Sequence, residues 1–360
     1  MENKNKKAVI AMSGGVDSSV AALLMKDNGY NCIGVTMKLI PDSHDIIDFE
    51  ASCCTKKDIE DAQKVSSVLG IPHYLYNFSD KFKEYVIDNF VSCYENGRTP
   101  NPCVECNRYL KFAALFSKAE ELGCDMVVTG HYAKVEFDQK SGRYLLKKAN
   151  DLSKDQSYVL YSLTQAQLSR ACFPLGEYSK DEARKIAEAN NFINADKGDS
   201  QDICFVKNCS YSEFIENYTG KKYPQGDFVD KNGRVLGRHK GIIRYTIGQR
   251  KGLGLILPEP MYVSKVDKET NTVVLSKEED IFTSELFAEN INIISCERIE
   301  GQLKIKAKIR YRQQEAPATV EQISDDKLRI VFDTPQRAIT KGQAVVLYDG
   351  DIVVGGGTIC

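Results

Sequence analysis

The sequence predicts an α/β domain built on a parallel sheet, followed by a small central domain and a C-terminal antiparallel β-barrel. Three observations support this. Short apolar strands alternate with amphipathic helices up to about residue 132, residues 211–260 are rich in glycine and basic side chains, and short alternating strands fill the rest. We expect domains at 1–208, 209–280 and 281–360, since 360 residues suffice for several separate cores.

The first domain alternates strand and helix, and several of its boundaries have a chemical signature. Glycines 29, 70 and 123 follow helical runs as C-caps, and Ser179 to Glu182 is a capping box that opens a helix to about Asn191. Residues 140–163 are predicted to be a polar excursion. The expected elements before it are a strand at 8–12, a helix at 18–28, a strand at 31–38, a helix at 55–69, a strand at 73–78, helices at 80–95 and 107–122, and a strand at 125–130.

The C-terminal third is predicted to consist of strands, because apolar residues recur there with a period of two. Many short strands of this kind are typical of a small antiparallel barrel. The expected strands cover residues 262–266, 272–276, 304–312, 318–322, 328–332, 344–348 and 352–358.

The segment Ser13-Gly14-Gly15-Val16-Asp17-Ser18 lies between the first predicted strand and the first helix. Its glycines let the backbone turn sharply and approach an oxyanion, and the free N–H groups of a helix start favour negative charge. The segment lacks the Gly-Lys-Ser/Thr ending of a kinase-type loop, which positions a lysine for a γ-phosphate. We therefore interpret it as a phosphate-binding loop of another type; the alternative is a plain Gly-Ser turn that closes a βα unit.

Composition points to a soluble protein of the cytoplasm. No apolar run approaches the length of a membrane span, and residues 1–7 are too polar for a signal peptide. A formal net charge of −2 shows no overall basic excess, so any nucleic-acid surface must come from local clusters. Twelve cysteines in a reducing compartment are not expected to form a disulfide framework.

Two cysteines are candidates for chemistry. Cys106 is predicted to lie just before a helix, whose positive end favours the reactive thiolate, and Cys204 follows a glycine-bearing turn. Two metal hypotheses remain open: a zinc site with Cys103, Cys106, Cys53 and Cys54, and an iron–sulfur cluster on Cys103, Cys106 and Cys204. Cys32, Cys124, Cys172 and Cys296 have apolar or structural contexts and are expected to be inert.

Two basic segments without acidic residues suggest an RNA surface. Residues 231–251 hold seven lysines and arginines, and residues 303–312 alternate apolar with basic side chains, which would place five cations on one strand face. The alternative is a solvated face without a partner. The alternation also turns Tyr311 away from Arg310, so both contact RNA only if a strand end or bulge lies there.

The phosphate loop resembles the SGGxDS loop of N-type ATP pyrophosphatases, and the whole chain resembles the bacterial tRNA-specific 2-thiouridylases. The resemblance rests on motifs spread over almost the full length. They are Ala11 to Ser18, Thr99-Pro100-Asn101-Pro102 followed by Cys106-Asn107, Thr129 to Ala133, Lys154 to Ser157, Ile203-Cys204-Phe205, Thr246 to Gly254, and Arg310-Tyr311-Arg312.

The resemblance implies roles for individual residues. ATP would be bound by Ala11, Met12, Ser13, Gly14, Gly15, Val16, Asp17, Ser18, Met37 and Gly130. Cys106 would be the nucleophile, and Cys204 would carry a persulfide. The target base would contact Asn101, Pro102 and Cys103, and tRNA would contact His131, Lys154, Asp155, Gln156, Arg310, Tyr311 and Gln343. The family pattern has aspartate at the position of Cys103, which keeps the cluster hypothesis open.

The implied reaction is adenylation at C2 of the anticodon wobble uridine with ATP and Mg²⁺, followed by transfer of persulfide sulfur to give 2-thiouridine, AMP and pyrophosphate. The implied partners are the tRNAs for lysine, glutamate and glutamine, and a cysteine desulfurase or sulfur-relay protein. Two other hypotheses about function remain open. One is an ATP pyrophosphatase that carries out amidation or transfers lysine to a base and needs neither Cys106 nor Cys204. The other is an RNA-binding module that senses metal or redox state.

Overall fold

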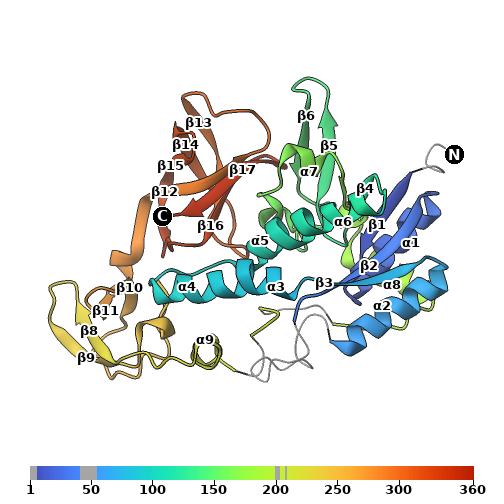
Figure 1. The fold of residues 1–360 in the computed structure, drawn as a ribbon. Coiled ribbons are helices and arrows are strands. Elements are labelled where there is room, and N and C mark those ends of the chain that lie inside the picture. The colour runs from blue at the N-terminus through green and yellow to red at the C-terminus, as the bar shows by residue number, and fades with distance from the viewer. Residues whose placement is uncertain (1–5, 41–54, 199–202, 207–208) are drawn as a thin grey trace.

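The computed structural model describes residues 6–40, 55–198, 203–206 and 209–360 (Figure 1). Their strands form three sheets: a five-stranded parallel sheet, a four-stranded central sheet and an eight-stranded sheet that contains a barrel. The predicted fold class is therefore confirmed. No helix among these residues is long and apolar enough to cross a membrane.

The parallel sheet has the strand order β3-β2-β1-β4-β7, and every neighbouring pair is parallel. The order reverses direction beside β1, and ligands of such sheets bind outside the carboxyl ends of the strands at that point. The crevice beyond β1 and β4 is thus the expected ligand position. The strands are β1 (Lys7–Ala11), β2 (Asn31–Lys38), β3 (His73–Asn77), β4 (Met126–Val128) and β7 (Ala171–Cys172).

Helices cover both faces of this sheet, as the alternating burial of β1 shows. Ala8 and Ile10 face one hydrophobic cluster, with side chains of α1 (Val16–Asp27), α2 (Lys56–Leu69) and α8 (Lys180–Ala189). Val9 faces the other cluster, which the helices of residues 79–121 cover. Capping confirms two predicted starts: Thr55 and Ser179 each form a capping box with the third helical residue.

The second helical layer contains two long helices with a π-type segment in each. The first runs from α3 (Ser79–Phe82) through Lys83–Asp88 to α4 (Asn89–Glu95). The second runs from α5 (Pro102–Glu105) through Cys106–Ala114 to α6 (Leu115–Glu121), and so begins earlier than predicted. Asn101 caps it and Pro102 occupies its first position, where a missing N–H costs nothing. Cys106 consequently lies after the first turn, not in front of the helix.

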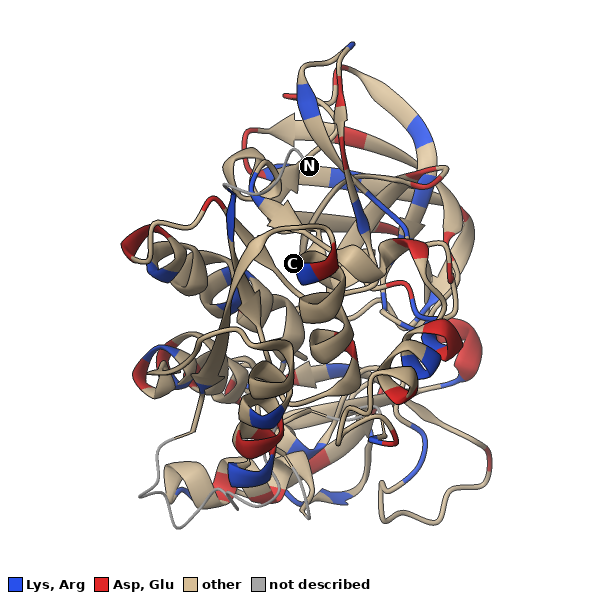
Figure 2. Ribbon diagram, turned by 90° about the vertical axis from the view of Figure 1, so that its right-hand side faces the viewer, with Lys and Arg blue, Asp and Glu red and all other residues tan. Residues whose placement is uncertain are grey.

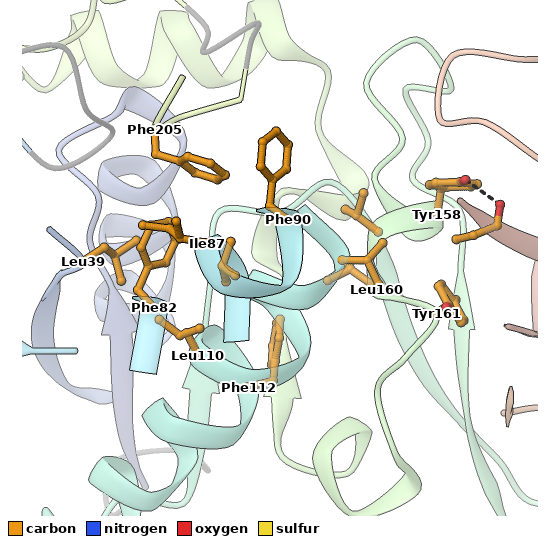
Figure 3. Close-up of a cluster of buried hydrophobic side chains, with 14 of the residues drawn as sticks. Leu39, Phe82, Ile87, Phe90, Leu110, Phe112, Tyr158, Leu160, Tyr161 and Phe205 are labelled. Atoms are coloured by element: carbon orange, nitrogen blue, oxygen red, sulfur yellow. Dashed lines mark hydrogen bonds between the residues drawn. The ribbon is translucent and has the colours of Figure 1, made fainter. Parts of the chain in front are cut away.

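Aromatic rings fill the space above the first of these helices (Figure 3). The ring of Phe205 packs edge-on against Phe82 and Phe90, at centroid distances of 5.7 and 5.2 Å. Phe90 also contacts Tyr94 and Phe214. This cluster fixes the chain around Cys204 to the α3–α4 helix.

The prediction of a polar excursion at residues 140–163 is wrong. Residues there complete a hairpin of β5 (Lys134–Asp138) and β6 (Arg143–Lys147), followed by a 3-10 turn (Ser157–Leu160) and α7 (Gln165–Leu168). The hairpin joins the C-terminal sheet, because Lys147 on β6 pairs with Ile352 on β17. Polar residues such as Glu136 and Lys147 lie at the surface of the hairpin, and they interrupt the apolar alternation from which strands are predicted.

The central sheet combines segments that the sequence pattern separated. Its order is β10-β11-β8-β9, so the strands near 262 and 272 belong here and not to the barrel. The members are β8 (Gly226–Asp230), β9 (Val235–His239), β10 (Tyr262–Asp267) and β11 (Thr272–Ser276), preceded by α9 (Tyr211–Thr219). Short 3-10 turns lie at Pro174–Glu177, Ile242–Arg244 and Glu278–Ile281.

The C-terminal barrel is closed by pairing between its first and last strands, β12 and β17. The sequence pattern missed β12, because its sequence FTSELFAENINI mixes polar and apolar residues and its burial alternates only in part. The strands are β12 (Phe282–Ile293), β13 (Gln302–Lys308), β14 (Ala316–Ser324), β15 (Lys327–Arg337), β16 (Ala344–Asp349) and β17 (Ile352–Ile359).

The aromatic cluster gives a test of the packing. Phe90→Ala removes a ring that is 1% exposed, and we expect the free energy of unfolding to fall by about 3–5 kcal/mol. Urea unfolding followed by circular dichroism measures the change. Phe137→Ala is the control, because that ring is 49% exposed and its removal should cost less than about 1 kcal/mol. Equal losses in the two variants would contradict the packing described above.

Candidate functional site

Hydrogen bonds of serine hydroxyl groups fix the conformation of the loop between β1 and α1. Gly15 caps α1 in an extended conformation, and the Ser18 and Ser19 hydroxyls donate to its carbonyl at 3.0 and 3.1 Å. The Ser13 N–H donates to Ser18 Oγ at 3.2 Å. The loop thus surrounds the start of a helix, where backbone N–H groups favour an anion.

Gly14 brings this loop against the first turn of α2. Its φ is +73°, and a Cβ there would lie 2.2 Å from the carbonyl oxygen of Asp58. The Gly14 carbonyl accepts hydrogen bonds from Asn194 Nδ2 at 3.0 Å and Lys197 Nζ at 2.9 Å. Lys197 also pairs with Asp58 and Asp61. The sequence reasoning missed Asn194 and Lys197, because no local pattern marks residues that reach the loop from so far along the chain.

Lys180 neutralises the carboxylate of Asp17 in the same loop. Lys180 Nζ donates to both of its oxygens at 2.8 Å, and the Tyr132 hydroxyl donates at 2.8 Å. Lys180 is 6% exposed, so this is a largely buried ion pair. From the sequence, Lys180 was predicted only as part of a capping box. It reaches Asp17 because α8 packs on α1, and the sequence does not reveal that packing.

The other residues predicted to bind ATP lie at the same edge of the sheet. A Cβ on Gly130, after β4, would lie 2.7 Å from the backbone of Asp17 and Ser18, so only a glycine allows this contact. Met37 is 9% exposed near the carboxyl end of β2. The structure therefore brings Gly130 against the loop and places Met37 on the neighbouring strand.

The two candidate cysteines lie against one hydrophobic cluster. Cys106 begins the π-type segment behind α5, and its neighbour Asn107 donates to the Val159 carbonyl at 3.0 Å, which ties that segment to the 3-10 turn. Cys204 is half-buried beside Phe205. Both thiols pack on the cluster that includes Phe82 and Phe90.

The remaining cysteines differ in their surroundings. Burial raises the pKa of Cys32 and Cys172 to about 11, which agrees with the inert role expected for them. Cys103 is exposed in the first turn of α5. Cys53 and Cys54 lie outside the described residues. Within the described ranges, no group of three histidine, cysteine or carboxylate side chains could hold a metal ion.

The barrel holds the loop in front of α5. Gln343 Nε2 donates to the carbonyls of Thr99 at 3.0 Å and Pro100 at 2.8 Å, and the Thr99 N–H donates to the Lys341 carbonyl at 2.9 Å. Asn101 Oδ1 accepts from the Val104 N–H as the helix cap. Gln343 thus reaches the predicted base-binding segment and fixes its backbone.

Arg310 and Tyr311 follow the end of β13, because the strand stops at Lys308. The five cations consequently do not share one strand face, as the alternation predicted. Arg310 Nη2 turns inward to the carbonyl of Ala338 at 2.8 Å, and burial lowers the pKa of its guanidinium. Tyr311 stays 38% exposed, with its ring 5.9 Å from that of Tyr158.

Tyr311 also lies near two other predicted contacts. Burial raises the pKa of its hydroxyl, and the nearby Asp155 and Cys103 raise it further. Asp155 accepts from Ser157 Oγ at 2.7 Å, and burial raises the pKa of its carboxyl. These contacts gather one residue from each of α5, the 3-10 turn and the barrel.

Lys154 and Gln156 flank Asp155 in the segment between β6 and the 3-10 turn. The Gln156 amide oxygen accepts from the Tyr132 N–H at 3.0 Å, and Gln156 N donates to the Tyr132 carbonyl at 2.8 Å. The segment that carries Lys154 is therefore fixed to the residue that also binds Asp17.

The structure places His131, which was predicted to contact RNA, largely inside the protein. The ring is 7% exposed, accepts or donates a hydrogen bond with Thr129 at 2.7 Å, and packs near Phe112 and Phe173. Burial lowers its pKa well below the ordinary value, with a further contribution from Lys111. His131 is an interior residue that shapes the end of β4, which is the plainer role of a histidine after an apolar strand.

The basic segment at 231–251 is less positive than its sequence suggests. Lys231, Arg238 and Arg244 each pair with an acidic residue from outside the segment, at 3.1, 2.8 and 2.9 Å. Lys and Arg positions alternate with Asp and Glu positions along the ribbon in the view of Figure 2. Only part of the segment is thus available to an external anion.

Three family models match the chain in succession. They are described as the tRNA methyl transferase HUP domain over residues 6–208, the tRNA methyl transferase PRC-barrel domain over 212–277 and the aminomethyltransferase beta-barrel domain over 283–359. One solved structure, described as a 4-thiouridine synthetase–RNA complex with bound ATP, is 18% identical and covers 59% of this chain and 52% of its own, with a TM-score of 0.39.

Relatives match along almost the whole chain. The tRNA-specific 2-thiouridylase MnmA of Clostridioides difficile (strain 630) is 52% identical over 355 residues, which are 99% of this chain and 98% of that protein. The tRNA-specific 2-thiouridylase MnmA 1 of Thermoanaerobacter sp. (strain X514) is 51% identical over 357 residues, again 99% and 98%. With about half of its residues identical to theirs from end to end, the protein belongs to the family of tRNA-specific 2-thiouridylases.

Proposed function

We propose that the protein uses ATP to replace the O2 oxygen of the anticodon wobble uridine in tRNA with sulfur. The observation that carries the proposal is the placement of Cys106 and Cys204 against one cluster, which packs on the sheet whose edge bears the phosphate loop. An ATP pyrophosphatase that transfers nitrogen needs neither thiol. The reaction therefore divides into activation at the loop and sulfur transfer at the cysteines.

Activation converts the uridine O2, which is a poor leaving group, into a good one. The uridine O2 attacks the α-phosphorus of ATP, which releases pyrophosphate and leaves the base adenylated. The backbone around Gly14 and Gly15 stabilises the developing phosphate charge. Mg²⁺ bound to the nucleotide would offset the charge of its phosphates, while the Asp17 carboxylate beside the loop is paired with Lys180.

Sulfur transfer follows at the two thiols. The terminal sulfur of a persulfide on Cys204 attacks C2, AMP leaves, and C2 becomes linked to Cys204 through two sulfurs. The Cys106 thiolate then attacks Cys204 Sγ, which breaks the sulfur–sulfur bond to the base and yields 2-thiouridine with a Cys106–Cys204 disulfide. A thiol reductant and a new persulfide must restore the enzyme.

The target base is held by residues from three elements. Asn101, Pro102 and Cys103 offer the first turn of α5, and Tyr311 exposes a ring beside them. An exposed ring suits a base that has left the anticodon stack. Arg310 and Gln343 stabilise this surface, because their side chains donate hydrogen bonds to the backbone carbonyls of Ala338 and Thr99.

The iron–sulfur cluster proposed from the sequence does not fit this arrangement. Cys103 is exposed whereas Cys106 and Cys204 are half-buried, and these three do not form a metal-binding group among the described residues. The reaction above needs no cluster. We keep the partners implied by the family: the tRNAs for lysine, glutamate and glutamine, and a cysteine desulfurase or sulfur-relay protein in the cytoplasm.

The cysteine roles can be tested separately from activation. Cys106→Ser and Cys204→Ser should each abolish 2-thiouridine, because each removes a sulfur that the balanced reaction requires, while tRNA-dependent pyrophosphate release continues. Nucleoside mass spectrometry and a pyrophosphate assay measure the two outcomes. Cys209→Ser is the matched control, since that thiol is exposed nearby and has no part in the scheme. Thiolation that survives in either of the first two variants would refute the proposed transfer.

The close approach at Gly14 gives a second test. Gly14→Ala should weaken ATP binding about tenfold or more, because the added Cβ collides with the Asp58 carbonyl oxygen and pushes the loop, with its phosphate-binding N–H groups, away from α2. Isothermal titration with ATP measures the dissociation constant. Gly142→Ala is the control: its φ is +67° but nothing lies within 4 Å of the added Cβ. Equal affinities in both variants would show that the collision is unimportant.

A further inference from the structure

Residues 250–262 form an exposed loop of the central domain that is closed at its base. The Gly248 N–H donates to the Val263 carbonyl at 2.7 Å, and the Val263 N–H donates to the Gln249 carbonyl at 2.9 Å. Gln249 Nε2 also donates to the Lys251 carbonyl at 3.0 Å. Compact loops with closed ends are frequently functional.

Leucines anchor this loop and leave one isoleucine outside. Leu253 is 7% exposed, and Leu255 fills the space beside Gly237, where an added Cβ would lie 2.5 Å from its Cδ2. Leu257 packs against the main cluster. Ile256 between them is 104% exposed, so an ordered loop presents an uncovered apolar side chain.

Two positive charges at the start of the loop are available to an external partner. Arg250 and Lys251 are exposed and form no ion pair with any described residue. Lys231, Arg238 and Arg244 in the same segment are paired with carboxylates. Of the exposed cations of the segment that remain, Arg234, Lys240, Arg250 and Lys251, only the last two are adjacent in the sequence, and they lie where the loop begins.

The base of the loop adjoins the predicted tRNA site. A Cβ on Gly248 would lie 2.6 Å from Ala338 Cβ and 3.9 Å from Arg310 Nη2. The Thr99 hydroxyl donates to Thr246 Oγ1 at 3.5 Å. The loop thus starts from the junction that holds both Arg310 and the segment before α5.

We infer that residues 250–256 bind the tRNA substrate, with Arg250 and Lys251 on backbone phosphates and Ile256 against a nucleobase. The inference rests on the proposed function and adds a surface to it. Lysine and arginine bind phosphates by charge, with a steep dependence on salt. An apolar side chain packs instead against a base, and its contribution does not depend on salt.

The charges are tested by the salt dependence of tRNA binding. In the double variant Arg250→Gln/Lys251→Gln, the slope of log affinity against log salt should fall by about 2, one for each lost phosphate contact. The matched control is Arg234→Gln/Lys240→Gln, which removes two exposed cations of the same domain at the two ends of β9 and outside the loop. Its slope should equal that of the wild type. Equal changes in the two double variants would overturn the inference.

The isoleucine is tested at a single residue. Ile256→Ser should weaken tRNA binding about fivefold to tenfold with the slope unchanged, because only apolar contact is lost. Binding that matches the wild type in this variant and in Arg250→Gln/Lys251→Gln would overturn the inference.

A protein partner gives a different pattern. If the variants bind tRNA normally but lose thiolation with the protein sulfur donor and keep it with an inorganic polysulfide, whose sulfane sulfur can form the persulfide on Cys204 directly, the loop binds the donor and the inference is wrong. Failure of the proposed function is distinguishable, since the wild type would then bind tRNA without forming 2-thiouridine.

Discussion

The contact between the Gly14 backbone and the first turn of α2 is the constraint on which the site depends. At this point the Gly14 carbonyl, the half-buried ammonium of Lys197 with its partner Asp61, and the start of α2 meet. A side chain on Gly14 would separate the loop from α2, and the loop would lose its bonds to Asn194 and Lys197. Phosphate binding therefore relies on tertiary packing as much as on the glycine-rich sequence.

The barrel fixes backbone atoms of the segment that carries the predicted base contacts. Gln343 and Lys341 hold the chain just before α5, and Tyr158 of the 3-10 turn donates to the Ala344 carbonyl at 2.8 Å. The first turn of α5 carries the predicted base contacts, so its position follows that of the barrel. The three sheets thus act as one support for residues that are distant in the sequence.

Much of the fold was predictable from local patterns, and the errors have physical causes. Thr55 and Gly70 marked the ends of α2 correctly, since caps are local chemistry. β12 and the β5–β6 hairpin were missed because their polar residues face solvent and their partners lie far away in the sequence. For the site, the residues proposed at the loop and α5 come from local motifs, whereas Lys180 and Lys197 reach the loop only through packing of distant segments. His131 was predicted to contact tRNA, and the sequence does not reveal that its ring lies near Phe112 and Phe173.

The pairing of β6 with β17 has a consequence for how the chain could be divided. Lys148 continues this junction, with its N–H bonded to the Asp351 carbonyl at 2.9 Å and its ammonium paired with Glu315 at 2.5 Å. A fragment that ended before the barrel would leave β6 as a bare edge, open to pairing with strands of other molecules. The nucleotide-binding part and the C-terminal part therefore share one continuous sheet, and each covers a strand edge of the other.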